Sequence, residues 1–521
     1  MAKITGGELL VDTLRGHGVR HVFSIIGGQM CSIYEALSRR PEMNLVTLRN
    51  EAAAPMMAAG CAAVTGRPSV SMCTVGAGVV YEVAGLLAAW YSYLPVISIA
   101  PQVQSWKMNP HQENLQGLNQ DGIFAPITKW NAIIYHWERI PALVNRALRE
   151  AQANAPGPVH LDVPVDVLFQ TRKLDASKKS KLMPPAATTR FIGSLPGPEE
   201  QVGNACSAIS RGERPVVLVG QGMGRPDRYP AIRDHLNRLR LPVLVSDCSF
   251  GTSDGKDASQ VGALGLFSGS EKGRQMIAEA DLILIIGLDD QIKEIIDQAG
   301  QDAAIVQVEV DPSALLTGRR DYLGVNADPI SFFSTLNQTN DHQGPKWPAW
   351  LEAMQKTGET IALEIAERRP ESASVFKGLA AGLGDDDIVV VDGAEPVRAA
   401  RAFLRQARYR NLFLMNTRDM AGVGLPFALG AKIGMPTHQV TLIVDKDSLF
   451  RHLQELQTAV GLGIGISIIC ADPGEGQALT RSAAILQGLG CEIGRLPAGE
   501  IPQRAESRRR LQAWLCVDNR E

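Results

Sequence analysis

The sequence predicts an α/β fold of three successive domains, each built on a parallel sheet. Three observations lead to this prediction. The length of 521 residues suits three domains of roughly 150 residues each. Short apolar runs alternate with helical patterns along the chain, which indicates parallel sheets with helices on both faces. Polar, proline-bearing stretches at 171–190 and 337–350 interrupt this alternation and are typical of linkers. We therefore expect domains at residues 1–180, 191–340 and 355–521.

The first domain begins with an amphipathic helical pattern over residues 1–18 that lacks the apolar core of a signal peptide. Further helical patterns lie at 32–40 and 51–66. Apolar runs predict strands at 21–26, 45–48, 69–75 and 95–100. Strands and helices alternate here as a parallel sheet requires.

The second and third domains repeat this organisation. Runs containing strands lie at 215–224, 241–247, 280–290 and 303–311, and then at 386–396, 410–415, 438–444 and 464–472. Many of the 50 glycines follow strands, and ligands of such sheets bind beyond the carboxyl ends of the strands. The stretch "GQGMGR" (220–225) matches only part of a dinucleotide fingerprint, because Arg225 replaces its third glycine, and a plain strand-to-helix connection is the better interpretation.

Composition excludes several classes of function. A net charge of −3 gives no support to nucleic-acid binding, and no apolar run reaches the roughly 18 residues of a membrane span. None of the eight cysteines forms a C-x-x-C pair, and Cys73 and Cys470 lie in apolar runs as buried thiols would. We expect neither a zinc site nor a disulfide framework, and a cytoplasmic location.

The stretch "VDKDSLF" (444–450) is the most unusual turn in the sequence. A buried strand precedes it and a helical pattern follows, so the turn lies where parallel sheets often bind phosphate. Yet Asp445, Lys446 and Asp447 occupy the turn, with no glycine among them. Two carboxylates there would repel a phosphate.

Five stretches, in this order, resemble the thiamine-diphosphate enzymes of the acetolactate synthase and pyruvate oxidase group. They are residues 16–37, 48–70, 74–101, 115–130 and 422–436, and the resemblance covers nearly the whole chain. It implies that the first domain binds the aminopyrimidine ring of thiamine diphosphate and that the third binds the diphosphate through magnesium. The middle domain of this group sometimes holds FAD. Each active site of the group lies between two chains, so the resemblance implies at least a dimer.

The resemblance also implies roles for single residues of the first domain. Glu51 matches the glutamate that hydrogen-bonds the aminopyrimidine ring and so helps to activate the thiazolium carbon. Gly27 and Gly28 match a glycine turn near the thiazolium ring, and Gln116 matches a glutamine beside the substrate. Two simpler interpretations stay open: Glu51 as a glutamate favoured by a helix N-terminus, and Gln116 as an ordinary polar loop residue.

The third domain departs from the family pattern. Gly422 and Gly424 match a late glycine motif, and Ser448 matches the serine of the family's G-D-G-S-F. Lys446, however, falls on the aspartate that binds magnesium, and an ammonium group cannot ligate a cation. A downstream asparagine pair falls on Asp472 and Pro473. We therefore expect no metal ligands in this chain.

Further departures lie around the same motifs. Ala421 replaces a methionine, residues 393–396 read "GAEP" in place of G-Q-H-Q, and Val75 and Ala77 alter T-S-G-P-G. Arg418 and Asp419 lie on a loop near this region and are expected to be exposed.

Three functions remain open from the sequence. In the first, the chain is one subunit of a mixed complex with an intact paralogue, and this complex acts on a small 2-keto acid as a decarboxylase or carboligase. Thiamine diphosphate would then bind only at a site shared with the partner, which would supply any magnesium; FAD is possible but unsupported. Alternatively, the chain works alone through a magnesium-independent pocket around Lys446, or it is a non-catalytic regulatory or scaffold subunit.

Overall fold

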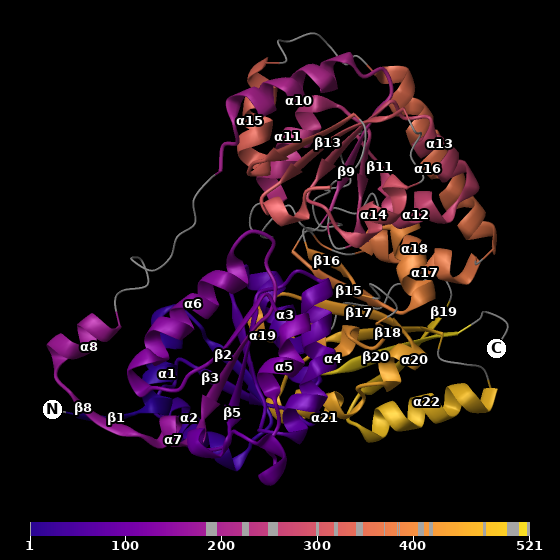
Figure 1. Cartoon of the computed structure of the whole chain (residues 1–521). Coiled ribbons are helices and arrows are strands. Elements are labelled where there is room, and N and C mark those ends of the chain that lie inside the picture. The colour runs from indigo at the N-terminus through magenta and orange to yellow at the C-terminus, as the bar shows by residue number, and fades with distance from the viewer. Residues whose placement is uncertain are drawn as a thin grey trace. The chain divides into compact units, whose positions relative to one another are not determined.

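Three six-stranded parallel sheets with flanking helices form the protein, which confirms the predicted fold class (Figure 1). The computed structural model describes residues 2–183, 195–220, 229–247, 249, 259–297, 302–316, 321–339, 347–368, 370–382, 384, 386–404, 411–415, 420–472, 476–497 and 510–517. The chain forms two compact units. The first comprises residues 1–192, 425–437 and 452–465, and the second comprises the remainder.

The first unit contains the N-terminal sheet, in the order β3-β2-β4-β5-β7-β6. Its strands are β2 His21–Ser24, β3 Asn44–Thr47, β4 Ser69–Met72, β5 Val96–Gln102, β6 Trp130–Ile133 and β7 Val159–Pro164. Its helices are α1 Gly6–Gly16, α2 Cys31–Ser38, α3 Ala53–Thr65, α4 Ala77–Tyr91, α5 Gln120–Phe124, α6 Ile140–Gln152, α7 Val165–Phe169 and α8 Ala176–Leu182, joined by most of α19 Gly424–Gly434 and by α21 Gln454–Leu462. The predicted strands and the helices at 32–40 and 51–66 are confirmed to within a few residues.

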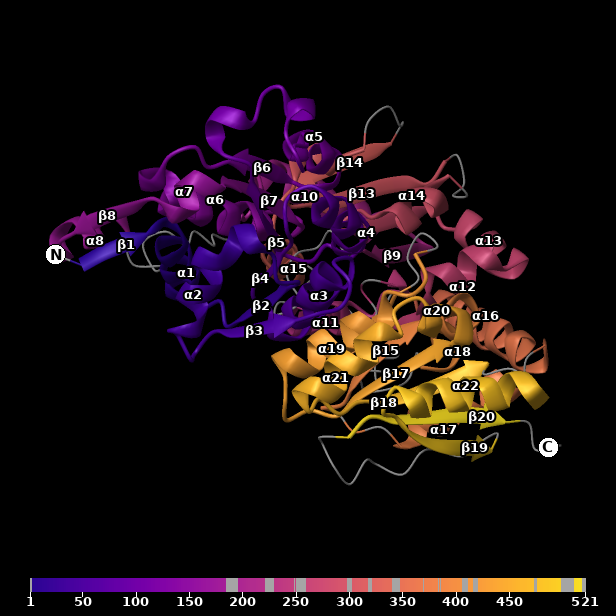
Figure 2. The same ribbon diagram turned by 90° about the horizontal axis from the view of Figure 1, so that it is seen from below.

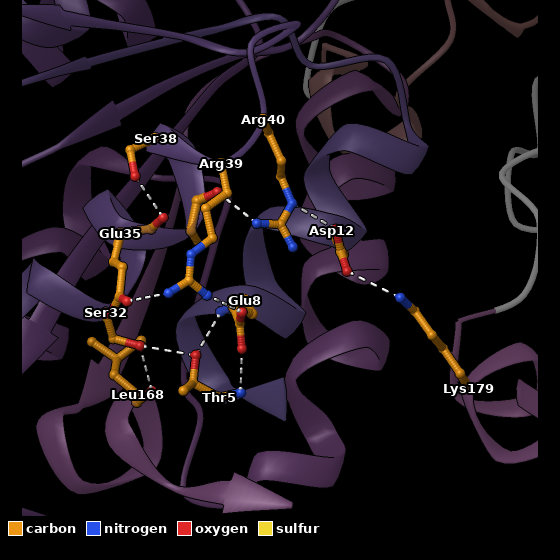
Figure 3. Close-up of polar contacts among 11 residues, drawn as sticks. Thr5, Glu8, Asp12, Ser32, Glu35, Ser38, Arg39, Arg40, Leu168 and Lys179 are labelled. Carbon is orange, nitrogen blue, oxygen red and sulfur yellow. Dashed lines mark hydrogen bonds and ion pairs between the residues drawn. The ribbon is translucent and has the colours of Figure 1, made fainter. Parts of the chain in front are cut away.

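Two predictions near the ends of this domain were wrong in part. Residues Ala2–Thr5 form strand β1, which pairs antiparallel with β8 (Thr171–Leu174), so α1 begins only at Gly6. The expected linker at 171–190 therefore starts with a strand and the helix α8, and its residues 184–190 lie outside the described part. Thr5 ends the strand because its side chain caps α1 in a capping box with Glu8 (Figure 3).

A buried carboxylate ties α1 to its neighbours. Asp12 accepts a hydrogen bond of 2.7 Å from Arg40 Nε and lies 3.2 Å from Lys179 Nζ on α8 (Figure 3). Burial alone would raise the pKa of Asp12, but the two cations outweigh burial and hold this pKa below its usual value. Asp12 thus joins α1 to the turn after α2 and to α8.

The second unit contains the other two sheets. The middle sheet has the order β11-β10-β9-β12-β13-β14, and the C-terminal sheet has the order β16-β15-β17-β18-β20-β19 (Figures 1 and 2). The middle strands are β9 Pro215–Val219, β10 Val243–Val245, β11 Gln260–Ala263, β12 Leu282–Ile286, β13 Ala304–Glu309 and β14 Tyr322–Asn326. The C-terminal strands are β15 Ile388–Asp392, β16 Asn411–Leu414, β17 Val440–Asp445, β18 Ser467–Asp472, β19 Glu492–Pro497 and β20 Gln512–Val517.

Helices cover both of these sheets. They are α10 Glu199–Arg211, α11 Tyr229–Leu239, α12 Leu264–Gly269, α13 Glu271–Ala278, α14 Asp290–Ile296, α15 Pro329–Thr339, α16 Pro348–Arg368, α17 Pro370–Gly382, α18 Ala394–Phe403, α20 Lys446–Phe450 and α22 Gly476–Gly488. Central strands such as β12 and β15 are apolar and buried along almost their whole length, as strands covered on both faces must be. The eight predicted strands are confirmed.

Other sequence predictions have mixed outcomes. Cys73 and Cys470 are buried thiols, as predicted. No helix in the described ranges is long and apolar enough to cross a membrane. Residues 221–225 of the partial dinucleotide motif and the loop with Arg418 and Asp419 lie outside the described residues. The exact domain boundaries stay a prediction.

Helix α3 packs against α19 with almost no space between the two backbones. A Cβ atom on Gly60 would lie only 2.0 Å from the Phe427 carbonyl oxygen, and one on Gly430 would lie 1.9 Å from the Met57 carbonyl oxygen. Glycine at both positions is therefore required for this close approach.

We predict that Gly60→Ala destabilises the first unit. The added methyl group forces the two helices apart, which costs about 1–3 kcal/mol and lowers the melting temperature by roughly 3–10 °C. Differential scanning calorimetry measures the shift. Gly203→Ala on α10 is the matched control, because Gly203 is exposed and its added methyl group meets no atom within 4 Å. Equal melting temperatures for Gly60→Ala and wild type would contradict the prediction.

Candidate functional site

One edge of the N-terminal sheet gathers residues from four different strand ends. The turn after β2 contains Gly27, and a Cβ atom there would lie 2.7 Å from the Thr74 side chain, which follows β4. Thr74 Oγ1 donates a hydrogen bond of 3.0 Å to Gln29 Oε1, and Gln29 Nε2 donates one of 2.8 Å to Gln116 Oε1. Gln116, from the long loop after β5, thereby joins the glycine turn. Gly28 has no atom within 4 Å of its Cβ position, so packing does not require glycine there.

Glu51 lies at the same edge, between β3 and α3. Its side chain is half-buried, and its Oε1 is 3.7 Å from the position that a Cβ atom would take on Gly78, in the first turn of α4. The segment before Glu51 is fixed at two points. The Arg49 N–H donates to Glu455 Oε1 on α21, and the Ala52 N–H donates to Asn50 Oδ1. The carboxylate of Glu51 is therefore held on an ordered turn and remains partly accessible.

The backbone of Gly76 packs directly against Gln116. Gly76 has φ +77°, a conformation that favours glycine, and a Cβ atom there would lie 3.1 Å from the Gln116 Cβ. Gln116 itself has φ +66°. The Gly76 N–H donates to Gln120 Oε1, and Gln120 Nε2 donates to the Asp162 carboxylate. A buried amide thus positions the turn on which Gln116 rests.

A fully buried polar network continues inward from Asp162. His160 Nε2 lies 3.0 Å from Asp162 Oδ1, and His160 Nδ1 lies 2.9 Å from Ser98 Oγ. Ser98 in turn donates to Glu82 on α4, which also accepts hydrogen bonds from Ser71 Oγ and Cys73 Sγ. Burial raises the pKa of Glu82, while the hydrogen bonds from Cys73 and Ser71 oppose that rise. Asp162 Oδ2 is buried and has no hydrogen-bond partner among the residues that the structure describes.

The corresponding edge of the C-terminal sheet is organised by Asp392, the last residue of β15. Its Oδ1 accepts the Gly393 N–H at 2.8 Å, and its Oδ2 accepts the N–H groups of Gly422 at 2.9 Å and Gly424 at 2.7 Å. Burial raises the pKa of Asp392 to about 6, the three N–H donors oppose that rise, and the nearby Asp445 adds to it. The N–H groups of Gly422 and Gly424 are therefore bonded within the chain.

In the turn "VDKDSLF", the side chain of Asp445 takes up the space and the N–H donor that a bound ligand would need. Asp445 ends β17 and caps α20, where its Oδ1 accepts the Ser448 N–H at 2.7 Å. A Cβ atom on Gly393 would lie only 2.0 Å from Asp445 Oδ2, so this carboxylate also fills the space beside the Gly393 turn. Lys446 is half-buried, and no hydrogen bond or ion pair joins it to another described residue. Ser448 is buried.

The structure brings most of the predicted site residues into two groups. Gly27, Gln116 and Glu51 surround the turn 74–78 in the first unit. The second group lies around the ends of β15 and β17 and comprises Gly422, Gly424, Lys446 and Ser448. Asp472 ends β18, where its backbone lies opposite that of Asp445 in the neighbouring strand β17. Pro473 lies outside the described residues. Among the described residues, no group of three or more histidine, cysteine, aspartate or glutamate side chains is placed to hold a metal ion. The functional roles of these residues stay predictions.

Sequence reasoning missed several residues of these edges. Gln29 and Thr74 lie within stretches already singled out, but their contact with Gln116 spans distant parts of the chain. Asp392 did carry a signal, because an aspartate directly before glycine ends a buried valine run. Glu82 also carried one, as the only charged residue in the apolar helix 77–91.

Comparison with protein-family models gives three matches in chain order. A model described as "Thiamine pyrophosphate enzyme, N-terminal TPP binding domain" matches residues 4–123. The central-domain model of the same enzymes matches residues 202–336. The model of the C-terminal TPP binding domain matches residues 393–483. The two groups of residues described above fall within the first and third matches.

Curated relatives align along almost the whole chain. Acetolactate synthase isozyme 1 large subunit of Escherichia coli (strain K12) is 27% identical over 472 residues, which are 90% of this chain and 81% of the relative. Acetolactate synthase of Arthrospira platensis is 26% identical, covering 91% and 82% of the two chains. Acetolactate synthase large subunit of Lactococcus lactis subsp. lactis (strain IL1403) is 25% identical, and the match covers 89% of this chain and 80% of the relative.

We predict that Asp392 makes stability depend on pH. Because its pKa in the folded chain, about 6, exceeds the ordinary value near 3.9, the folded state binds this proton more tightly than the unfolded state. The contribution is full below about pH 4 and is lost as the pH rises through about 6, a change of about 3 kcal/mol. Asp392→Asn should therefore reduce the fall in the urea unfolding midpoint between pH 5 and 7.

The exposed Asp386, just before β15, provides the matched control. Asp386→Asn should retain the pH dependence of the wild type. If Asp392→Asn also retains it, the buried carboxyl does not titrate as expected.

Proposed function

The chain belongs to the thiamine pyrophosphate enzyme family, and from this premise we propose that it is a subunit of an acetolactate synthase-like complex that acts on a 2-keto acid. In this proposal the first domain contributes Glu51 and Gln116 to an active site shared with a paralogous chain. The acetolactate synthases among the relatives of this chain support the reaction class. Bound thiamine diphosphate supplies the group that stabilises the carbanion formed on decarboxylation.

The residues around Glu51 fit the aminopyrimidine half of the cofactor. The Glu51 carboxylate is half-buried and fixed on an ordered turn, so it can hold a proton at a ring nitrogen with little rearrangement. Gln116 is exposed at the same edge and anchored through Gln29, where it can orient a substrate. This anchored pair is the observation that supports a retained pyrimidine half.

The residues of the third domain do not fit a magnesium diphosphate. The donors that a phosphate would need are used by the chain itself, since Asp392 takes the N–H groups of Gly422 and Gly424 and Asp445 takes that of Ser448. The Asp445 carboxylate would repel a diphosphate, and the Lys446 ammonium cannot bind magnesium. We therefore propose that this half of the active site comes from the partner chain.

An apolar face of α4 is consistent with a partner chain. Val80 is 54% exposed and Tyr81 is 62% exposed, side by side near the start of this helix. Large apolar side chains grouped on one exposed helix face are typical of protein interfaces. We propose that a second chain of this fold covers α4, in a homo- or hetero-oligomer.

We predict that the purified homomer does not bind thiamine diphosphate in a magnesium-dependent manner at its third domain. Isothermal titration calorimetry with the cofactor, with and without Mg²⁺, measures this. The matched variant replaces Asp445, Lys446 and Asp447 by Gly, Asp and Gly, which frees the start of α20 and supplies a carboxylate. Its magnesium dependence should exceed that of the wild type. Tight, magnesium-dependent binding by the wild type would contradict the prediction.

We predict that the two domains respond differently to substitution in the reconstituted complex. Glu51→Gln should lower the rate of 2-keto acid consumption by at least about a hundredfold, because an amide is a far weaker proton acceptor. Lys446→Ala should leave the rate nearly unchanged. The measurement uses this chain co-expressed with its candidate paralogue.

Glu150→Gln, at a half-buried glutamate on α6, is the control for loss of charge in the first unit. The opposite pattern, with Glu51→Gln silent and Lys446→Ala inactive, would show that catalysis uses the pocket of this chain around Lys446. Loss of activity in neither variant would favour a regulatory or scaffold role.

A further inference from the structure

A groove in the first unit lies outside both groups of candidate site residues. Its volume is about 540 Å³, within the range of small-molecule sites. Its walls come from the start of β2, from β3, from α2 and the turn that follows it, and from the ends of α19 and α21. All of these segments belong to the first unit. His21 and Asn44 pair at the amino ends of β2 and β3, so this part of the groove is remote from the carboxyl edge that carries Glu51.

The lining of this groove is largely apolar. Leu37 and Met43 are buried, and Ile433 and Ile464 are half-buried. Leu462, the last residue of α21, also lines the groove and is 44% exposed. An apolar ligand that covers these side chains removes their surface from water, which is the main favourable contribution to binding in such sites.

Tyr34 on α2 forms a fixed part of the wall. Its hydroxyl oxygen lies 3.0 Å from Ser24 Oγ and donates a hydrogen bond of 3.0 Å to the Ile25 carbonyl oxygen. The Gly27 N–H donates to the same hydroxyl at 3.3 Å. The ring is therefore held in place from its far end, so little conformational entropy is lost when a ligand packs against it.

The charged groups at the groove are balanced within the chain. Among the described residues that line it there is no carboxylate, and Arg40 is the one guanidinium or ammonium group. Arg40 Nε donates to Asp12 at 2.7 Å and Arg40 Nη1 donates to the Ala36 carbonyl oxygen (Figure 3). Burial, and after it the charge of Arg20, lowers the pKa of His21, so this imidazole is uncharged at neutral pH. A charged ligand would lose its hydration here without gaining a counter-charge.

Uncharged hydrogen-bonding groups complete the lining. Ser38 Oγ donates to the Glu35 carbonyl oxygen at 2.9 Å, which leaves its lone pairs free to accept a hydrogen bond. The exposed side-chain amide of Asn44 bonds to no other residue in the described ranges. We propose that this groove binds an uncharged, largely apolar small molecule that carries an amide or a similar neutral polar group. In this proposal the apolar side chains cover its body, and Ser38 and Asn44 bond its polar end.

The test uses three probes with one carbon skeleton and different charges: 4-phenylbutanamide, 4-phenylbutanoate and 4-phenylbutylamine. Ligand-observed NMR titrations of the full-length chain at pH 7.5 measure their affinities. The neutral amide should bind, and it should bind at least about tenfold more tightly than the anion and the cation, because only the amide enters without an unpaired charge. Leu462→Glu, which brings a carboxylate to the apolar wall, should weaken amide binding at least about tenfold. Leu462 is partly exposed, so the urea midpoint of this variant should stay close to that of the wild type.

Val460→Glu is the matched control, because Val460 lies on the same helix, is 50% exposed and does not line the groove. This variant should leave amide binding unchanged. Three results would each overturn the proposal: no binding of the amide at millimolar concentration, binding of either charged probe as tight as that of the amide, or unchanged amide affinity in Leu462→Glu. These measurements use neither thiamine diphosphate nor a keto acid, so they stand apart from the proposed function.

Discussion

Parallel strand pairing is the constraint on which the rest of this structure depends. Neighbouring strands run in one direction, so their carboxyl ends, and the turns that follow them, lie along one edge of each sheet. In the first sheet this arrangement places Glu51, Thr74 and Gln116 together although they follow three different strands. In the C-terminal sheet it aligns the ends of β15, β17 and β18, where three aspartates terminate adjacent strands. The geometry of both candidate sites follows from this single rule.

The two edges use their polar groups in different ways. At the first edge, uncharged hydrogen bonds from Thr74 through Gln29 to Gln116 order the loops, and the Glu51 carboxylate is left accessible. At the third edge, Asp392 and Asp445 consume backbone N–H groups that an external anion would otherwise bind. Such donors stabilise either an internal or an external carboxylate or phosphate, but not both. This difference is the physical basis for proposing that the two halves of the chain serve different active sites.

Charged groups in the interior of the first unit are tolerated because nearly all are hydrogen-bonded. Glu82 lies on an otherwise apolar helix and accepts three side-chain donors, and His160 connects it through Ser98 to Asp162. A buried carboxylate without such donors would cost several kcal/mol. Through Gln120 the network reaches the buried turn at Gly76, against which Gln116 packs, so the order of the Gln116 loop is coupled to the packing of the core.

The sequence by itself determined the fold class, because the alternation of apolar runs with helical patterns is a local signal that indicates parallel sheets covered by helices. It also located Glu51, Gln116 and the "VDKDSLF" turn, since these lie in local motifs. It did not reveal β1 and β8, which pair across about 170 residues, or β20, which inserts between β18 and β19. Nor could it show that Asp392 accepts the N–H groups of Gly422 and Gly424. These contacts join residues 30 and 32 positions apart in the chain, and only tertiary structure brings their atoms within hydrogen-bonding distance.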